Sequence, residues 1–220
     1  MKNEKLLIYG NGHFAEYVAY VFENDTKYEL MGFCIEKDFY SGKTNDGRPV
    51  YIFEEILKET TFKDYKLFIA VGNNLIRKKI FEKAKFAGYS FANYISSKAN
   101  YWPNIKLGQN IFIDEGCTIQ PFVTILNNNI LFASNIAHHT LINSHSLISV
   151  CTTGGNVTIG EESFIGMNTT IKQNVIIGRR NVIGMGCIIE SNTPNDAVYS
   201  QKGTVKRDLS YSQVTSHFLK

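Results

Sequence analysis

Histidines gather in one short segment of this chain. His138 and His139 are adjacent and His145 follows closely, so the segment holds three of the five histidines in the sequence. An imidazole whose pKa lies at about 6.5 accepts a proton at neutral pH, which suits it to general base catalysis. The segment also lies between two interruptions of an otherwise regular six-residue repeat. We therefore expect chemistry here, with His138 and His139 as the catalytic candidates. His139 could instead face solvent, and for His145 a structural role is favoured.

A glycine-rich turn near the start of the chain is suited to binding phosphate. The run Gly10-Asn11-Gly12-His13-Phe14-Ala15 has GxGxx(G/A) spacing and lies between a strand-like apolar run and a helical pattern. Glycines let the backbone approach a ligand, and the N–H groups at a helix N-terminus attract anions. Glu36 follows the next predicted strand, where dinucleotide-binding folds carry the acid that binds ribose. This domain is short, so the pattern favours a mononucleotide or nucleotide-sugar pocket. The alternative is a vestigial domain that only packs against its neighbour.

A second polar turn, Gly72-Asn73-Asn74, closes the third predicted strand. Ligands of open parallel sheets gather at the carboxyl ends of the strands, so both turns should border one crevice. Asn73 could instead only cap the next helix, and His13 could be an ordinary surface residue. The candidates for substrate binding are Gly10, Gly12, His13, Phe14, Glu36, Lys37, Gly72 and Asn73.

The elements that position these turns alternate between strand and helix. Apolar runs predict strands over 5–9, 30–35, 67–71 and 90–94, and helical spacing predicts helices over 15–23, 53–58 and 74–87. The last helix carries a basic face that includes Arg77. Such alternation implies a parallel sheet with right-handed crossovers, which is a Rossmann-like α/β domain.

The rest of the chain has a different period. Aliphatic residues recur every six positions in three blocks that begin at Leu107, Ile130 and Ile159, giving fourteen such positions. A six-residue repeat is typical of a parallel β-helix, in which each hexad supplies a short strand and points its aliphatic residue inward. The repeat slips before Ile130 and again after Ile148. The only tryptophan, Trp102, is expected to cap the first coil in the core.

Composition excludes several classes of protein. Lys and Arg number 23 against 20 Asp and Glu, and a net charge of +3 with scattered lysines does not indicate a nucleic-acid partner. No apolar run approaches the roughly 20 residues that span a bilayer, and the first is too short for a signal peptide, so we expect a cytoplasmic protein without membrane insertion. The 4 cysteines lie far apart, which predicts reduced, buried thiols and neither a disulfide nor a metal site.

These motifs together resemble the hexapeptide-repeat acyltransferases of the sialic-acid O-acetyltransferase type, a family that includes N-acetyltransferases of bacterial nucleotide-linked amino sugars. The resemblance spans residues 4–205. It is carried by the two N-terminal turns, by Asn135-Ile136-Ala137-His138-His139-Thr140, and by the hexads at 157–160 and 163–166. It implies a Rossmann-like α/β domain over 1–96, an all-β left-handed parallel β-helix over 97–194, and a C-terminal tail over 195–220.

The resemblance also implies a site. The donor would be acetyl-CoA, no metal would take part, and a homotrimer would hold its active sites between neighbouring β-helices. His138 matches the catalytic histidine of the family, whereas His139 stands where the family often has an acid. Backbone N–H groups at the second slip could bind the acyl oxygen or the pantetheine. The cofactor-binding candidates are Gly154, Gly155, Gly166 and Lys172.

Three functions stay open at this point. The preferred one is N-acetylation of an amino sugar of the 4-amino-4,6-dideoxyhexose type, carried on dTDP or UDP, for a bacterial surface polysaccharide such as O-antigen or another glycan. The second is O-acetylation of a sugar hydroxyl. The third is a non-catalytic trimeric scaffold that binds nucleotide sugars.

Overall fold

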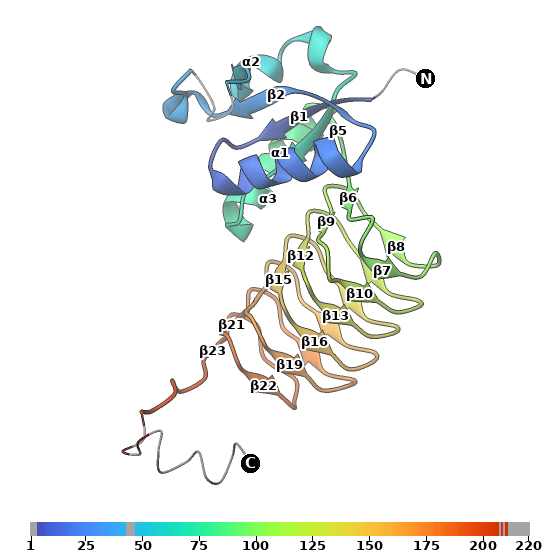
Figure 1. Cartoon of the computed structure of the whole chain (residues 1–220), viewed down its shortest axis with the longest axis vertical. Coiled ribbons are helices and arrows are strands. Elements are labelled where there is room, and N and C mark those ends of the chain that lie inside the picture. Colours follow the sequence, from blue (N-terminus) through green and yellow to red (C-terminus); the bar gives the residue numbers. More distant parts are fainter. Residues whose placement is uncertain (1–3, 43–46, 207, 209, 211–220) are drawn as a thin grey trace.

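Short apolar runs and amphipathic helices build the N-terminal domain. The computed structural model describes residues 4–42, 47–206, 208 and 210, with this domain above a long β-helix (Figure 1). Its strands are β1 (Lys5–Tyr9), β2 (Glu29–Ile35), β3 (Val50–Ile52), β4 (Lys66–Ile69) and β5 (Ser90–Phe91). Its helices are α1 (His13–Asp25), α2 (Phe53–Ile56) and α3 (Asn74–Phe86), with single 3-10 turns η1 (Lys37–Phe39) and η2 (Thr60–Phe62). The strands are parallel in the order β3-β2-β1-β4-β5, which confirms the predicted α/β class.

Two strands of this domain differ from the prediction. β3 was not predicted, because it contains only three residues and its pairing with β2 leaves no periodic pattern. The predicted strand at 90–94 ends at Phe91, and Tyr94 already belongs to the β-helix. Asn93 marks the change of sheet, because its side chain donates to Gly108 O at 2.8 Å and accepts from Ile111 N–H at 2.9 Å in the first coil.

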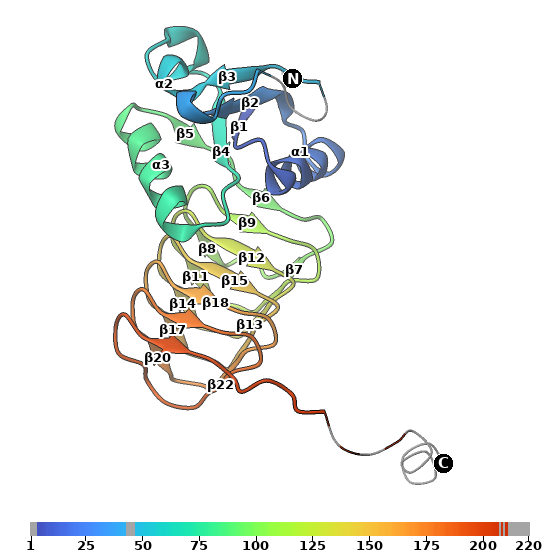
Figure 2. The same cartoon turned by 90° about the vertical axis from the view of Figure 1, so that its left-hand side faces the viewer.

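The hexads wind into three parallel sheets, which form the three faces of a prism (Figures 1 and 2). Face 1 contains β7 (Asn100–Tyr101), β10 (Thr118–Ile119), β13 (Asn135–Ile136), β16 (Thr152–Thr153), β19 (Thr170–Ile171) and β22 (Ile188–Ile189). Face 2 contains β8 (Lys106–Leu107), β11 (Thr124–Ile125), β14 (Leu141–Ile142), β17 (Thr158–Ile159) and β20 (Ile176–Ile177). Face 3 contains β6 (Tyr94–Ile95), β9 (Phe112–Ile113), β12 (Ile130–Phe132), β15 (Leu147–Ser149), β18 (Phe164–Ile165), β21 (Val182–Ile183) and β23 (Val198–Tyr199). This is the predicted left-handed parallel β-helix.

The repeat explains the architecture residue by residue. The inward aliphatic side chains, such as Ile113, Ile119 and Ile125, are fully buried and stack into one continuous core. Each coil turns at corners where a residue has positive φ, and asparagine frequently holds this position, as Asn128 and Asn156 do. Asparagine tolerates the left-handed region better than most residues, so these polar corners are compatible with the sharp turns.

The two slips shorten the coils around the histidines, but the prediction that the first slip precedes an inward Ile130 is wrong. Leu131 pairs with Ile113 and lies in the β-helix core, whereas Ile130 packs against the N-terminal domain, so the first slip follows Leu131. Thr118 pairs with Asn100 in the preceding coil and with Asn135 in the following coil. The sequence separation from Thr118 to Asn135 is one residue shorter than that from Asn100 to Thr118. The step from Asn135 to its own partner in the next coil, Thr152, is equally short. The second short coil brings Thr153 to an inward position that isoleucine holds in neighbouring coils, and this polar side chain is buried.

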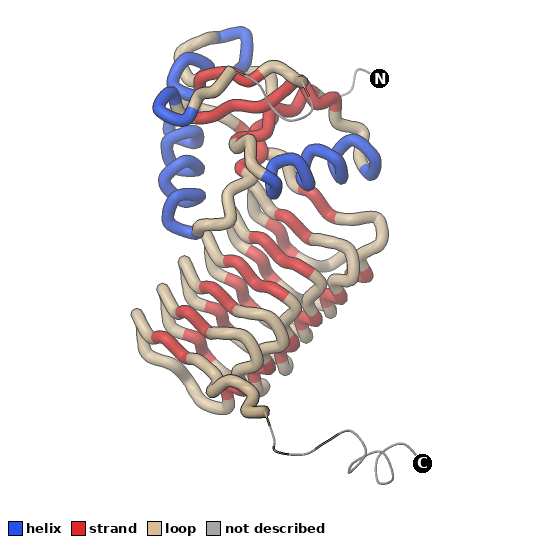
Figure 3. Tube along the Cα trace, turned by 60° about the vertical axis from the view of Figure 1, so that its left-hand side comes forward, coloured by secondary structure: helices blue, strands red, loops and turns tan. Residues whose placement is uncertain are grey.

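The N-terminal domain docks on face 3 and on the corner between faces 2 and 3. Phe14 of α1 contacts Phe112 and Phe132 edge-to-face, with ring centroids 5.8 Å apart in both cases. Figures 2 and 3 show α3 and α1 lying beside the upper coils. The corner between faces 1 and 2, called the 1–2 corner, is the edge of the prism opposite face 3, so this domain leaves it uncovered.

Arg77 joins the two domains at the corner between faces 2 and 3. Its side chain is fully buried although it begins the basic run of α3. The guanidinium donates to carbonyl oxygens of Val71 and Gly72 in the N-terminal domain and of Asn128 and Ser146 in the β-helix, at 2.9 to 3.3 Å. A single buried cation therefore ties the end of β4 to two successive coils.

Trp102, the cysteines and the C-terminal tail complete the comparison of the fold with the sequence. Trp102 is 58% exposed on the 1–2 corner, so the prediction of a core role is wrong. The cysteines are free and buried, as predicted. Residues 207, 209 and 211–220 of the expected tail lie outside the described residues. In the part of the chain that is described, no helix has the length and apolarity needed to cross a membrane.

Candidate active site

His138 lies on the 1–2 corner, two residues after the end of β13, with its side chain exposed. Its backbone N–H donates to Oε1 of Gln120 in the preceding coil at 3.0 Å. Its imidazole lies over Gly155 in the following coil. A Cβ atom at position 155 would stand 2.7 Å from Nε2 and 3.1 Å from Nδ1 of His138. The absence of a side chain at Gly155 therefore creates the space that the imidazole occupies.

His139 contacts Nδ1 of the His138 imidazole. The two Nδ1 atoms are 3.1 Å apart, and the ring planes meet at 85°. His139 has positive φ, 59°, and its ring lies against Phe122 with centroids 4.8 Å apart. Because two facing lone pairs at this distance repel, one Nδ1 carries a proton and donates it to the other. When His138 is the donor, its exposed Nε2 has a free lone pair and can accept a proton.

Beside His138, the coil that follows the histidines presents a backbone N–H that has no hydrogen-bond partner within the described part of the chain. Thr153 Oγ1 accepts the Ala137 N–H at 3.0 Å, which fixes the backbone just before His138. The Gly154 N–H donates to Ile171 O at 2.7 Å, so the expectation that this group could turn toward an acyl oxygen is wrong. Among the described residues, no hydrogen bond uses the Gly155 N–H.

The remaining cofactor-binding candidates lie apart from one another. Lys172 is exposed on the same 1–2 corner, one coil beyond Gly154. Gly166 follows β18 on face 3, so a single chain does not bring it beside Lys172. A Cβ at Gly166 would stand 2.8 Å from Met185 N, so the close approach of the next coil by itself explains the glycine at this position. Burial raises the pKa of the Cys151 thiol to about 12, which disfavours a covalent acyl-enzyme.

The N-terminal candidates meet at one edge of the sheet. Gly10, Glu36 and Gly72 follow β1, β2 and β4, which are neighbours in the sheet, so the prediction of a shared edge is met by their positions. Gly10 has φ of +115°, and a Cβ there would lie 3.0 Å from Ala70 O. Burial, with the Glu36 carboxylate beside the phenol, raises the pKa of Tyr9. Glu36 is thus already hydrogen-bonded within the domain.

Other N-terminal candidates have structural partners. Gly12 is the N-cap of α1, and His13 is exposed with its Nδ1 3.6 Å from Glu16. Phe14 packs on the β-helix rather than lining an open crevice. The Lys37 N–H donates to Glu54 at 3.1 Å. The Asn73 side chain caps α3, accepting the Leu75 and Ile76 N–H groups at 3.0 and 3.1 Å.

A cavity of about 320 Å³ opens beside the second polar turn, and of its lining the sequence predicted only Gly72 and Asn73 as site residues. Residues 72–75 border it on one side. The β-helix contributes Glu162, Phe164, Arg180 and Val182. Arg180 donates from its NH2 group to Asp196 Oδ2 at 2.8 Å. Hexad spacing alone identifies these as corner and outward positions, but only the docking of α3 brings them to Gly72.

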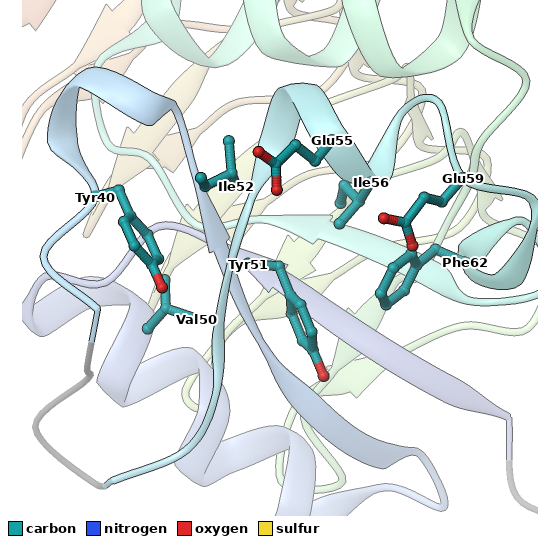
Figure 4. A pocket seen from close by; sticks show the side chains of 8 residues that line it. All are labelled: Tyr40, Val50, Tyr51, Ile52, Glu55, Ile56, Glu59 and Phe62. Atoms are coloured by element: carbon teal, nitrogen blue, oxygen red, sulfur yellow. The ribbon is translucent and has the colours of Figure 1, made fainter.

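A second cavity, of about 300 Å³, lies at the edge of the N-terminal sheet (Figure 4). It is formed by β3, α2 and the segments that flank them. Tyr51 and Phe62 meet there edge-to-face, with centroids 5.1 Å apart. Its lining residues are Tyr40, Val50, Tyr51, Ile52, Glu55, Ile56, Glu59 and Phe62. It contains none of the predicted site residues.

His145 has the structural role that the sequence favoured. It is 6% exposed at the corner that receives the N-terminal domain. The Ile69 N–H donates to Asn110, Asn110 donates to Asn128, and Asn128 donates to Nδ1 of His145, at 2.7 to 2.8 Å. Burial, with the nearby Lys78 charge, lowers the pKa of His145 to about 4. The imidazole is therefore neutral at physiological pH.

Within one chain, the two candidate regions do not meet. The N-terminal edge lies above face 3, whereas His138 lies on the opposite 1–2 corner. Over the described residues, no group of three or more His, Cys, Asp or Glu side chains could hold a metal ion.

Comparisons with known proteins agree with this architecture. The family model described as the PglD N-terminal domain matches residues 5–84, and the bacterial transferase hexapeptide (six repeats) model matches residues 156–191. The acetyltransferase domain of PglB from Neisseria gonorrhoeae FA1090 is 26% identical, with a TM-score of 0.79 over 89% of this chain and 96% of that one. The same domain has been solved in complex with acetyl coenzyme A, and that structure has a TM-score of 0.80 at 26% identity over 90% and 96% of the two chains.

Two more distant structures share the fold. PerB from Caulobacter crescentus, solved with CoA and GDP-perosamine, is 21% identical with a TM-score of 0.78 over 88% of this chain and 92% of that one. WeeI from Acinetobacter baumannii AYE is 20% identical with a TM-score of 0.77 over 89% and 96% of the two chains. The two matched domains and their order lead to one conclusion: the chain joins a PglD-type N-terminal domain to bacterial transferase hexapeptide repeats that form a left-handed β-helix, and it is similar over most of its length to an acetyltransferase domain.

Proposed function

We propose that this protein transfers the acetyl group of acetyl-CoA to the amino group of a nucleotide-linked amino sugar. The observation that carries the proposal is the exposed imidazole of His138, held between His139 and the side-chain-free surface of Gly155. The likeness to the PglB acetyltransferase domain, whose structure with acetyl coenzyme A is known, supports the donor.

In the proposed reaction, His138 moves the proton and Gly155 stabilises the negative charge that develops on the acetyl oxygen. Acetyl-CoA supplies the acetyl group as a thioester. His138 Nε2 accepts a proton from the acceptor amine as its nitrogen bonds to the acetyl carbon. The Gly155 N–H donates to the acetyl oxygen as negative charge develops there. His138 then returns the proton to the sulfur as the carbon–sulfur bond breaks, so the protein ends in its starting state. Lys172, exposed on the same corner, is available to the charged part of the donor.

The separation of the two regions supports a homotrimer. The N-terminal crevice of one chain lies on the far side of the prism from its own His138. A substrate held by that crevice would instead reach His138 of a neighbouring subunit. We thus assign nucleotide-sugar binding to residues 1–96 and acyl transfer to 97–194, and give 195–220 no catalytic part. Light scattering should return three times the chain mass, and a monomer at working concentration would contradict this arrangement.

The acceptor that we propose is an amino sugar of the 4-amino-4,6-dideoxyhexose type linked to UDP or dTDP, which would serve the synthesis of a bacterial surface polysaccharide or glycan. Its support is the phosphate-type turn retained at Gly10 to Ala15, ahead of the β-helix. Gly10, Gly12, Glu36 and Gly72 lie along the strand ends where such a ligand would bind.

A thiol-release assay tests the proposal. The protein is incubated with acetyl-CoA and with panels of UDP- and dTDP-linked sugars that present either an amine or a hydroxyl. His138→Ala should lower kcat by about 10²–10⁴-fold with little change in either KM. Release only with hydroxyl acceptors would indicate O-acetylation instead. Nucleotide-sugar binding without CoA affinity would indicate a scaffold.

A further inference from the structure

We infer that His139 is a positioning residue that accepts the Nδ1–H of His138 and so leaves the exposed Nε2 of His138 as the base. This inference rests on the proposed function, because it assigns the atom that keeps His138 ready to accept a proton. It begins from one contact, the 3.1 Å separation of the two Nδ1 atoms.

That contact allows two neutral arrangements. In the first, His138 Nδ1–H donates to His139, and His138 Nε2 keeps a free lone pair toward the open corner. In the second, His139 Nδ1–H donates to His138, and the remaining proton of His138 sits on Nε2. Only the first arrangement leaves a base at the exposed atom. An acceptor amine that donates its own N–H to Nε2 favours this arrangement as it binds.

The surroundings hold His139 in place without contributing charge. Its backbone N–H donates to Pro121 O at 3.3 Å, and Phe122 lies against its ring. The coil before the pair presents Gln120, Pro121 and Phe122, and the coil after it presents residues 154–156, none of which titrates. The next titratable side chain along the 1–2 corner of the same chain is Lys172, which lies one coil beyond Gly154.

A histidine in this role differs from a carboxylate in one respect. A carboxylate can only accept, so it always selects the Nδ1–H tautomer of its partner. A protonated His139 has an N–H at both nitrogens, so it must donate at Nδ1 and force the His138 proton onto Nε2. Protonation of either histidine therefore removes the base at Nε2 of His138.

Three substitutions at position 139 separate these roles, and each has a precedent at a corner of this chain. Phe122, Asn156 and Glu162 all have positive φ, between 58° and 66°, so the corresponding residues fit the backbone. His139→Phe keeps an aromatic ring against Phe122 but cannot accept a hydrogen bond. His139→Glu supplies a carboxylate acceptor. His139→Asn keeps a small polar corner and serves as a check on folding.

The experiment measures kcat, KM and the pH dependence of kcat/KM with the amino-sugar acceptor, after circular dichroism and light scattering establish folding and assembly. His139→Phe should lower kcat at least about tenfold with KM nearly unchanged, since only the orientation and tautomer of the base are lost. His139→Glu should retain most of kcat at pH 7.5, and its acidic limb should move up by about one pH unit, because a negative partner stabilises the imidazolium.

Two results would overturn the inference: a His139→Phe protein with unchanged kcat, or a His139→Glu protein whose acidic limb coincides with that of the wild type. His138→Asn is measured in parallel. Retained activity in His138→Asn would refute the general-base function itself, whereas an inactive His138→Asn beside fully active position-139 variants would refute only the role of His139.

Discussion

Adding one methyl group at Gly155 should disable the proposed base without unfolding the protein. The Cβ of Gly155→Ala would stand 2.7 Å from His138 Nε2 and 3.1 Å from Nδ1. Non-bonded carbon and nitrogen atoms settle at about 3.5 Å or more. Gly155 does not have a positive φ, so alanine brings no backbone strain of that kind. The atoms in conflict are at the free end of a side chain, so the imidazole can rotate away.

The size of the effect follows from this displacement. Moving Nε2 from 2.7 Å to an ordinary contact requires a shift of about 1 Å. A misplacement of about 1 Å in a catalytic group costs on the order of 10²-fold in rate. The same rotation would break the contact with His139 Nδ1, which adds to the loss. We expect kcat to fall about 10²-fold, while the melting temperature and the KM for acetyl-CoA change little.

Gly154→Ala is the matched control. A Cβ there would stand 2.5 Å from Gln173 N and 2.7 Å from Gln173 Cα. These are backbone atoms of the next coil and cannot rotate away, so this variant should lose about 1–3 kcal/mol of stability. Thiol release against acetyl-CoA concentration gives kcat and KM, and thermal unfolding gives stability. A folded Gly155→Ala protein with kcat within threefold of the wild type would refute the placement of His138 over Gly155 as the active geometry.

Three other perturbations test the remaining parts of the molecule. Arg77→Met should lower the free energy of unfolding by about 3–5 kcal/mol in urea titrations, because it removes hydrogen bonds from a buried cation to carbonyl oxygens of both domains, and a loss below about 1 kcal/mol would contradict that role. The pKa of His145 is lowered to about 4 in the folded protein, so its contribution to stability is present above about pH 6.5 and is lost as pH falls toward 4. Unfolding free energies at pH 7 and 4 should differ by about 3 kcal/mol from this group, and His145→Asn, which matches the neighbouring Asn128, should reduce the difference. Gly12→Arg should raise the acceptor KM and spare that for acetyl-CoA, whereas Gly12→Ala, whose Cβ meets nothing within 4 Å, should leave both unchanged; equal acceptor KM values in all three proteins would place the nucleotide elsewhere.

The sequence alone determined the two-domain order, the α/β class of the first domain and the β-helix of the second. The reason is that these features are periodic. An inward aliphatic residue recurs about every six positions, and most of the predicted ones between Ile113 and Ile183 are buried in the same core, the exception being Ile130, whose place Leu131 takes. The position of His138 two residues after inward Ile136 likewise predicted that it would lie exposed on a corner. Short elements were harder, since the three residues of β3 carry no period.

Only the tertiary structure decided what the polar residues do. Arg77 looks like one member of a solvated basic face, yet it is buried because β4 and two coils surround it with carbonyl oxygens. Trp102 looks like a core residue, yet it is exposed because its corner points away from the docked domain. Contacts between coils depend on the register in which successive coils pair, and slips in that register decide which side chains face each other. The pairing of His138 with Gly155, and the separation of both from the N-terminal crevice, therefore become visible only once the coils are stacked and the domain is docked.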